Sequence, residues 1–170
     1  MAVNAEKPRK RRSLGGWKFI VAIVLILGYS VAAAYGVMSD TSVRELTVKM
    51  FDVSRHCTTN PSTTLKTLNY NVRGSIWSTS SIQTSLSHLT FTLSVDGSII
   101  GTNSQGDGSF GPGQSVAFNL IFPHPTLNPT TLPLSSRLVL TVSATVAAGL
   151  YSANEAASDN TLQTFSSTGC

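Results

Sequence analysis

The chain has 170 residues, a formal net charge of +4 and a composition that is 41% hydrophobic but only 12% charged. This length is enough for one hydrophobic core but not for two. Six of the twelve Lys and Arg residues, but only one of the eight acids, lie within the first 18 residues. The positive charge is therefore a local N-terminal feature, and we expect no nucleic-acid partner.

Residues 1–16 are basic, contain Pro8, Gly15 and Gly16, and show no apolar periodicity. A segment of this composition cannot bury enough apolar surface to fold by itself. We therefore predict a disordered cytoplasmic tail over residues 1–16.

Residues 17–38 form the most apolar stretch of the chain. No charged residue occurs from Phe19 to Met38, and these 20 residues show no polar face at the helical period. About 20 apolar residues, at ~1.5 Å rise each, cross a hydrocarbon core of ~30 Å as a helix. The sequence predicts a transmembrane helix at 17–38, with the lipid bilayer as the partner of Phe19 to Met38.

The charges that flank this helix predict its orientation. The candidate topology signal consists of Lys7, Arg9, Lys10, Arg11, Arg12 and Lys18. Because basic residues are retained on the cytoplasmic side, residues 1–16 are expected inside and residues 39–170 outside. This arrangement corresponds to a single-pass protein of the cell membrane.

Three outcomes remain open for the N-terminal segment. It can stay as a signal anchor, or it can be cleaved as a signal peptide at the small residues Ala32-Ala33-Ala34. A third outcome comes from Gly15-Gly16, which follow a basic stretch and precede the apolar helix. This arrangement resembles archaeal type IV pilin precursors, in which a peptidase cuts before the helix.

The domain that follows begins with an ambiguous stretch. In residues 43–53, the apolar residues Leu46, Val48 and Met50 occupy even-numbered positions, whereas Phe51 and Val53 occupy odd-numbered ones. This pattern predicts either a strand with a bulge or face switch, or a membrane helix that runs on a turn or two before the sheet. A polar loop is expected at residues 54–64, and the alternation of residues 68–76 predicts the next strand.

The clearest strand lies at Leu89–Val95, where apolar residues alternate with Thr and Ser. Asp96-Gly97 follows and predicts a type I′ hairpin into residues 98–101. The Gly-rich residues 103–114 are expected to form a connecting loop. They lack both the spaced carboxylates of a calcium loop and the Lys-Ser/Thr pair of a phosphate loop.

Three further strands complete the pattern, at residues 116–122, 138–146 and, as a short last strand, 161–165. About seven antiparallel strands with regular turns predict an all-β fold, an immunoglobulin-like β-sandwich over residues 39–170. The Pro-rich residues 123–136 are expected to form an extended loop. Its Leu127, Leu132 and Leu134 either cap the sandwich end or offer a contact surface to a protein partner at the outer membrane face.

Two segments carry a family resemblance, LNYNVRGSIWSTSSIQTSLSHLTFTLSVDGSIIG and GSFGPGQSVAFNLIF. Their strand, break, hairpin and Gly/Pro turn resemble the type 2 late embryogenesis abundant domain, also called the water-stress and hypersensitive-response domain. The resemblance covers residues 43–165. It implies an immunoglobulin-like sandwich, often tethered by one N-terminal membrane helix, and it brings no catalytic residues.

The sequence offers little site chemistry. His56, His88 and His124 lie in different segments without a second ligand at metal spacing, and no catalytic signature motif occurs. We therefore expect no catalytic residues, no metal and no cofactor. Cys57 and Cys170 form a candidate disulfide outside the cytoplasm, with two free thiols or an intermolecular bond of Cys170 as alternatives.

These observations favour a membrane-anchored extracytoplasmic sandwich that acts as a non-catalytic binding, structural or stress-protective module. A type IV pilin-like filament subunit is the first alternative. A secreted sandwich that binds carbohydrate or acts as an enzyme is the second, although Trp77 is the only tryptophan beyond the helix.

Overall fold

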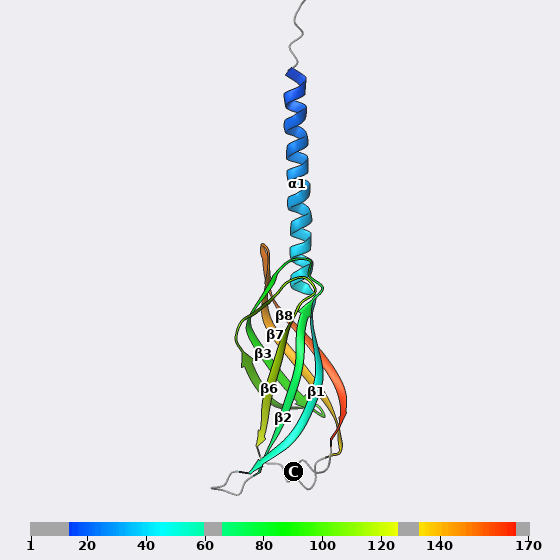
Figure 1. Ribbon diagram of the computed structural model, residues 1–170, viewed down its shortest axis with the longest axis vertical. Helices are drawn as coiled ribbons and strands as arrows, with labels where there is room; N and C mark the ends of the chain where they lie inside the picture. The colour runs from blue at the N-terminus through cyan, green and yellow to red at the C-terminus, as the bar shows by residue number, and fades with distance from the viewer. Residues whose placement is uncertain (1–13, 60–65, 126–132, 166–170) are drawn as a thin grey trace, which may run out of the picture. The chain divides into compact units, whose positions relative to one another are not determined.

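The computed structural model describes residues 14–59, 66–125 and 133–165 (Figure 1). One N-terminal apolar helix precedes eight strands, which form two antiparallel sheets. The expected all-β sandwich with a preceding helix is therefore confirmed. The chain divides into two compact units, Met1–Tyr35 and Gly36–Cys170.

Helix α1 spans Leu14–Arg44 and is longer than the predicted 17–38. It is long and apolar enough to cross a membrane. Every residue from 16 to 35 is exposed, whereas Ser39, Ser42 and Val43 are buried. The helix therefore runs on past the apolar segment, as one of the two alternatives for residues 43–53 anticipated, because its last turns bury one face on the sandwich unit.

The first sheet has the order β1-β2-β6, with strands at Leu46–Thr59, Lys66–Ser78 and Ser115–Pro125. The second has the order β4-β3-β7-β8, with strands at Ser98–Gln105, Thr84–Val95, Ser135–Ala148 and Tyr151–Thr164. The short strand β5, Gly108–Phe110, also pairs with β3. The core lies between the two sheets, where the rings of Phe91 and Phe118 pack with centroids 5.0 Å apart.

A bulge at Phe51 explains the parity switch in β1. The pairing of β1 with β2 shifts between Met50 and Asp52, which leaves Phe51 66% exposed, while Met50 and Val53 are both buried. Gly74 lies opposite Met50, and a Cβ there would clash with the Lys49 carbonyl oxygen and the Phe118 ring. The bulge therefore depends on the missing side chain at position 74.

The two sheets are also tied at their edges. The Met50 amide of β1 donates a hydrogen bond of 2.8 Å to the Asp159 carboxylate of β8. On the other side, the Asn103 side-chain amide of β4 donates to the Ile121 carbonyl of β6 at 3.3 Å. These bonds use edge groups that would otherwise be open to pairing with another chain.

Three predictions about loops and strand lengths were wrong. Strand β1 continues to Thr59 through the expected loop at 54–64, and β4 and β5 occupy much of the expected loop at 103–114. Strand β8 starts at Tyr151 rather than near residue 161. Polar, Gly-rich and Ala-rich residues have low strand propensity, but ladder pairing to neighbouring strands overrides that preference here.

The predicted hairpin at Asp96-Gly97 is confirmed. Both residues have positive φ, 49° and 85°, and they connect β3 to β4. A type I′ turn requires this conformation at both central positions.

We predict that Gly74→Ala lowers the free energy of unfolding by about 1–3 kcal/mol, because the new methyl group overpacks the bulge against a backbone carbonyl. Urea unfolding of the full chain in detergent micelles measures the change. Gly106→Ala is the matched control, since a Cβ at Gly106 meets no atom within 4 Å. Equal stabilities of the two variants would show that the bulge tolerates a side chain.

Candidate functional site

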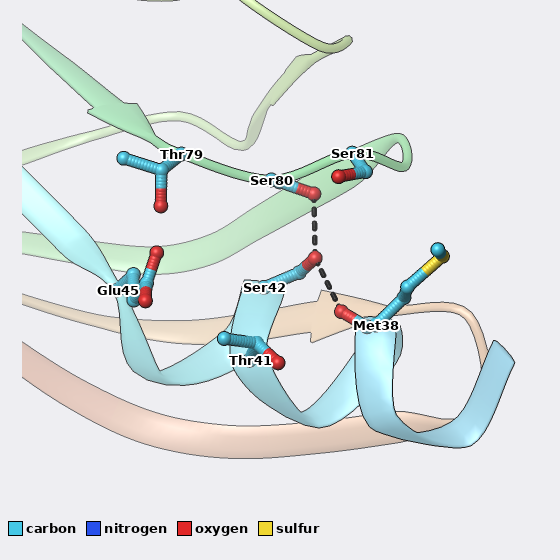
Figure 2. A pocket seen from close by; sticks show the side chains of 7 residues that line it. All are labelled: Met38, Thr41, Ser42, Glu45, Thr79, Ser80 and Ser81. Atoms are coloured by element: carbon cyan, nitrogen blue, oxygen red, sulfur yellow. Dashed lines mark hydrogen bonds between the residues drawn. The ribbon is translucent and has the colours of Figure 1, made fainter. Parts of the chain in front are cut away.

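A polar cavity of about 130 Å³ lies where the end of α1 meets the loop between β2 and β3 (Figure 2). Its lining comprises Met38, Thr41, Ser42, Glu45, Thr79, Ser80 and Ser81. We call the buried hydroxyls beside it, those of Ser42, Ser78 and Ser80, the serine cluster; each of these residues is at most 5% exposed.

The serine cluster is held by hydrogen bonds across the helix end. The Ser80 hydroxyl donates to the Ser42 hydroxyl at 2.7 Å, and the Ser42 hydroxyl donates to the Met38 carbonyl at 2.6 Å, as Figure 2 shows. The Ser78 hydroxyl donates to the Ser42 carbonyl at 3.1 Å. The helix leaves its last carbonyls without internal partners, and here the Ser78 side chain satisfies one of them.

Ser80 also shapes the loop that presents it. Its hydroxyl accepts a hydrogen bond of 3.0 Å from the Ile82 amide, and its own amide donates to the Ser78 hydroxyl at 3.2 Å. Such local bonds from serine side chains to backbone amides stabilise tight turns. The serine cluster therefore fixes both the helix end and the β2–β3 loop.

The groups that line this cavity hold the end of α1 against the β2–β3 loop, and we call this region the joint. Its lining offers hydroxyl groups, one thioether and the Glu45 carboxylate, with no histidine or lysine to activate a serine as a nucleophile. Both buried serines of the lining are already engaged with backbone carbonyls or with each other. The cavity is polar and large enough to admit water.

Two charged groups flank the joint on the exposed side of the helix. The Arg44 guanidinium bonds the Asp40 carboxylate at 3.0 Å, one helical turn away. This hydrogen bond raises the pKa of Arg44. A cation in the last turn also interacts favourably with the negative end of the helix dipole.

A second hollow of about 150 Å³ lies at the bulge in β3. It is lined by His88, Ser143, Ala144, Thr145, Asn154 and Glu155. The Thr145 hydroxyl donates to the Asn154 side chain at 2.8 Å, and His88 has a positive φ of 53°. Within residues 14–59, 66–125 and 133–165, no group of three or more His, Cys, Asp or Glu residues is placed to hold a metal ion.

An aromatic cluster is formed by Tyr70, Phe165 and Arg55. The Tyr70 and Phe165 rings meet edge to face at 6.0 Å, and the Arg55 guanidinium lies 4.5 Å from the Phe165 ring centroid. Arg55 also donates to the Pro133 carbonyl at 2.9 Å. Burial raises the pKa of the Tyr70 hydroxyl, and the charge of Arg55 opposes this shift.

The sequence-predicted residues do not converge on one site within the described part of the chain. Lys18 is exposed on α1, whereas Lys7, Arg9, Lys10, Arg11 and Arg12 lie outside the described residues. Leu134 is 57% exposed just before β7, and its predicted companions Leu127 and Leu132 lie outside as well. The histidines His56, His88 and His124 lie on three different strands.

Cys57 lies on β1 and is disulfide-bonded. Its predicted partner Cys170 falls outside the described residues, so the pairing of these two residues stays a prediction.

Sequence reasoning missed the serine cluster. In the sequence, residues 78–81, Ser-Thr-Ser-Ser, indicate only a break between strands. Serines are common in such breaks, and nothing local in the sequence connects them with Ser42, which precedes Ser80 by 38 residues.

Comparisons with known proteins give no family. No family model and no curated protein matches the chain. A protein from Archaeoglobus fulgidus is 6% identical with a TM-score of 0.40, over 68% of this chain and 97% of that one. The sporulation control protein Spo0M of Bacillus subtilis is 13% identical with a TM-score of 0.41, over 71% of this chain and 49% of its own. β-Glucuronidase 2 of Bacteroides uniformis is 19% identical with a TM-score of 0.36, over 71% of this chain and 13% of its own. Similarities at this level carry no argument about function.

We predict that Ser80→Ala lowers the free energy of unfolding by about 1–3 kcal/mol, because it leaves the partly buried Ile82 amide without its partner and removes the buried bond to Ser42. Ser81→Ala is the matched control, since Ser81 is exposed in the same loop, and it should change the stability by less than about 0.5 kcal/mol. Urea unfolding followed by near-ultraviolet circular dichroism measures both variants. A Ser80→Ala variant as stable as the control would contradict a structural role for the cluster.

We also predict a loss of stability in alkali that depends on Tyr70. The folded-state pKa of Tyr70 is raised above its ordinary value of 10.0, so the stabilisation is fully present below pH 10.0 and is lost as the pH rises through the folded-state pKa. Tyr70→Phe should flatten this part of the pH profile of the unfolding free energy. Parallel profiles for wild type and variant would show that another group causes the loss.

Proposed function

We propose that the chain is a single-pass membrane protein that presents its β-sandwich outside the cytoplasm as a non-catalytic binding, structural or stress-protective module. In this proposal the sandwich belongs to the type 2 late embryogenesis abundant class. One observation carries the proposal: residues 16–35 form an apolar helix that is exposed on every side.

The exposed apolar surface of α1 requires a non-aqueous environment. Phe19, Leu25 and Ile26 are each at least 65% exposed, and their helix neighbours are apolar too. Soluble monomers rarely leave a contiguous apolar patch beyond a few hundred Å² in water. A bilayer covers such a helix completely, and the helix satisfies its own backbone hydrogen bonds there.

The proposed orientation rests on charge. Lys18 and the five basic residues at positions 7–12 precede the apolar segment, whereas seven of the eight acids follow it. The positive-inside rule then favours a cytoplasmic N-terminus and an outer sandwich.

A filament subunit is the alternative with specific support. Gly15-Gly16 lie at the start of α1, where a pilin-type peptidase would act, and a filament core would also cover the apolar helix. A secreted sandwich would instead require cleavage near Ala32-Ala33-Ala34.

The N-terminus and intact mass of the protein purified from its native membranes test these alternatives. We expect the full mass with the basic leader retained, because the signal anchor is not cleaved. External protease should then remove the sandwich from intact cells or right-side-out vesicles while it spares a membrane-protected N-terminal fragment.

Three other results would contradict the proposal. A new N-terminus at Trp17 would identify a filament subunit, and one near Tyr35 would identify a secreted domain. A sandwich that resists protease until the membrane is opened would reverse the proposed orientation.

A further inference from the structure

We propose that the tip of the β7–β8 hairpin, Gly149-Leu150-Tyr151, is a second membrane contact that places Leu150 and the Tyr151 ring in the interfacial layer of the bilayer. This inference rests on the proposed membrane anchoring and goes beyond it, because the contact is made by the sandwich unit itself.

The tip presents apolar groups where a soluble hairpin presents polar ones. Leu150 is 84% exposed, more than any other large hydrophobic residue in the described part of the chain, and Tyr151 is 47% exposed. Gly149 has a positive φ of 58°, which lets the chain reverse and leaves Leu150 at the turn. Figure 1 shows that this hairpin, drawn in orange, reaches beyond the other turns at the same end of the sandwich.

Within the Gly36–Cys170 unit, the proximity of the Tyr151 hydroxyl to Gly36 sets the depth of the tip. A Cβ placed on Gly36 would lie 3.8 Å from the Tyr151 hydroxyl oxygen. Gly36 belongs to the uncharged segment Phe19 to Met38, and only Val37 and Met38 separate it from the segment's end. At ~1.5 Å rise per residue, Tyr151 therefore lies about 3 Å inside the apolar boundary, in the interfacial layer where Tyr is enriched.

The hairpin itself carries no charge near its tip, and the charges at the end of α1, Asp40 and Arg44, pair with each other. No charged residue occurs from Leu138 to Asn154, so the nearest charge along β8 is Glu155, about 13 Å from Tyr151 at ~3.3 Å per residue. The neighbouring turns at this end of the sandwich, Thr79–Gln83 and Gly111–Gln114, are also uncharged. By contrast, the hairpin at the opposite end carries Asp96, whose carboxylate accepts the Arg137 amide at 2.8 Å. A lipid surface is therefore the occupant that we assign to the tip.

Depth-dependent fluorescence quenching tests the assignment with the full-length chain in phosphatidylcholine vesicles. Leu150→Trp is made in a chain that also carries Trp17→Phe and Trp77→Phe, and the quencher is phosphatidylcholine brominated near the top of its acyl chains. Leu162→Trp is the matched control, because Leu162 is 74% exposed on the same strand but pairs with Arg137 at the other end of the sandwich.

We expect brominated lipid to quench the Leu150→Trp chain severalfold more strongly than the Leu162→Trp chain, with a blue-shifted emission only at position 150. The same two substitutions in the wild-type background avoid any loss of folding from the replaced tryptophans. In this background, the quenched fraction of the total tryptophan fluorescence should be larger for the Leu150→Trp chain than for the unsubstituted chain. It should be smaller for the Leu162→Trp chain.

A third chain separates this inference from the anchoring on which it rests. It keeps Trp17 as its only tryptophan, through Trp77→Phe, and so reports on the helix alone. Quenching of Trp17 together with equal, weak quenching at positions 150 and 162 would overturn the hairpin contact and leave the anchor intact. Unquenched Trp17 would overturn both.

Discussion

The end of helix α1 imposes the constraint on which the rest of the structure depends. Residues 16–35 are exposed and, from Phe19 on, uncharged, yet Ser39, Ser42 and Val43, within the next eight residues, are buried against protein. A helix end buried in protein must find partners for its last carbonyls, because water no longer supplies them. Ser78, at the end of β2, donates to the Ser42 carbonyl, and Ser80, in the β2–β3 loop, donates to the Ser42 hydroxyl. The same three serines therefore hold the helix end against the start of the sandwich.

The position of the helix end determines where the first sheet starts, because β1 begins two residues after the helix ends. Because side chains alternate across a strand, the first residues of β1 determine which face enters the core. The bulge at Phe51 reverses that parity once, and Gly74 makes room for the bulge on the neighbouring strand. The Asp159 carboxylate then bonds the Met50 amide beside the bulge, which ties this edge of the first sheet to β8.

The sequence was sufficient where a single physical signal dominated. Strands β3 and β7 show strict alternation because both lie inside their sheet with one face in the core, and the turn at Asp96-Gly97 has a strong local preference. Strand β8 was mostly missed because its inner face holds Ala153, Ala157 and Asp159 rather than large apolar residues. The serine cluster could not be predicted at all, since it depends on how residues 42 and 80 meet in three dimensions.

The composition of the β7–β8 turn connects this fold to its proposed location. In water, an exposed leucine at a hairpin tip gains nothing and creates a risk of association. Hairpin turns favour Asn, Asp and Gly because one or both of their central residues adopt positive φ. Both turns meet this requirement, but the Asp96-Gly97 turn exposes a polar residue, whereas the Gly149-Leu150 turn exposes a leucine. The two turns also differ in position, because the apolar turn is the one whose Tyr151 hydroxyl lies near Gly36 of α1. An apolar tip at that level is stable next to lipid and costly in water, which supports the proposed bilayer contact at the helix end of the sandwich.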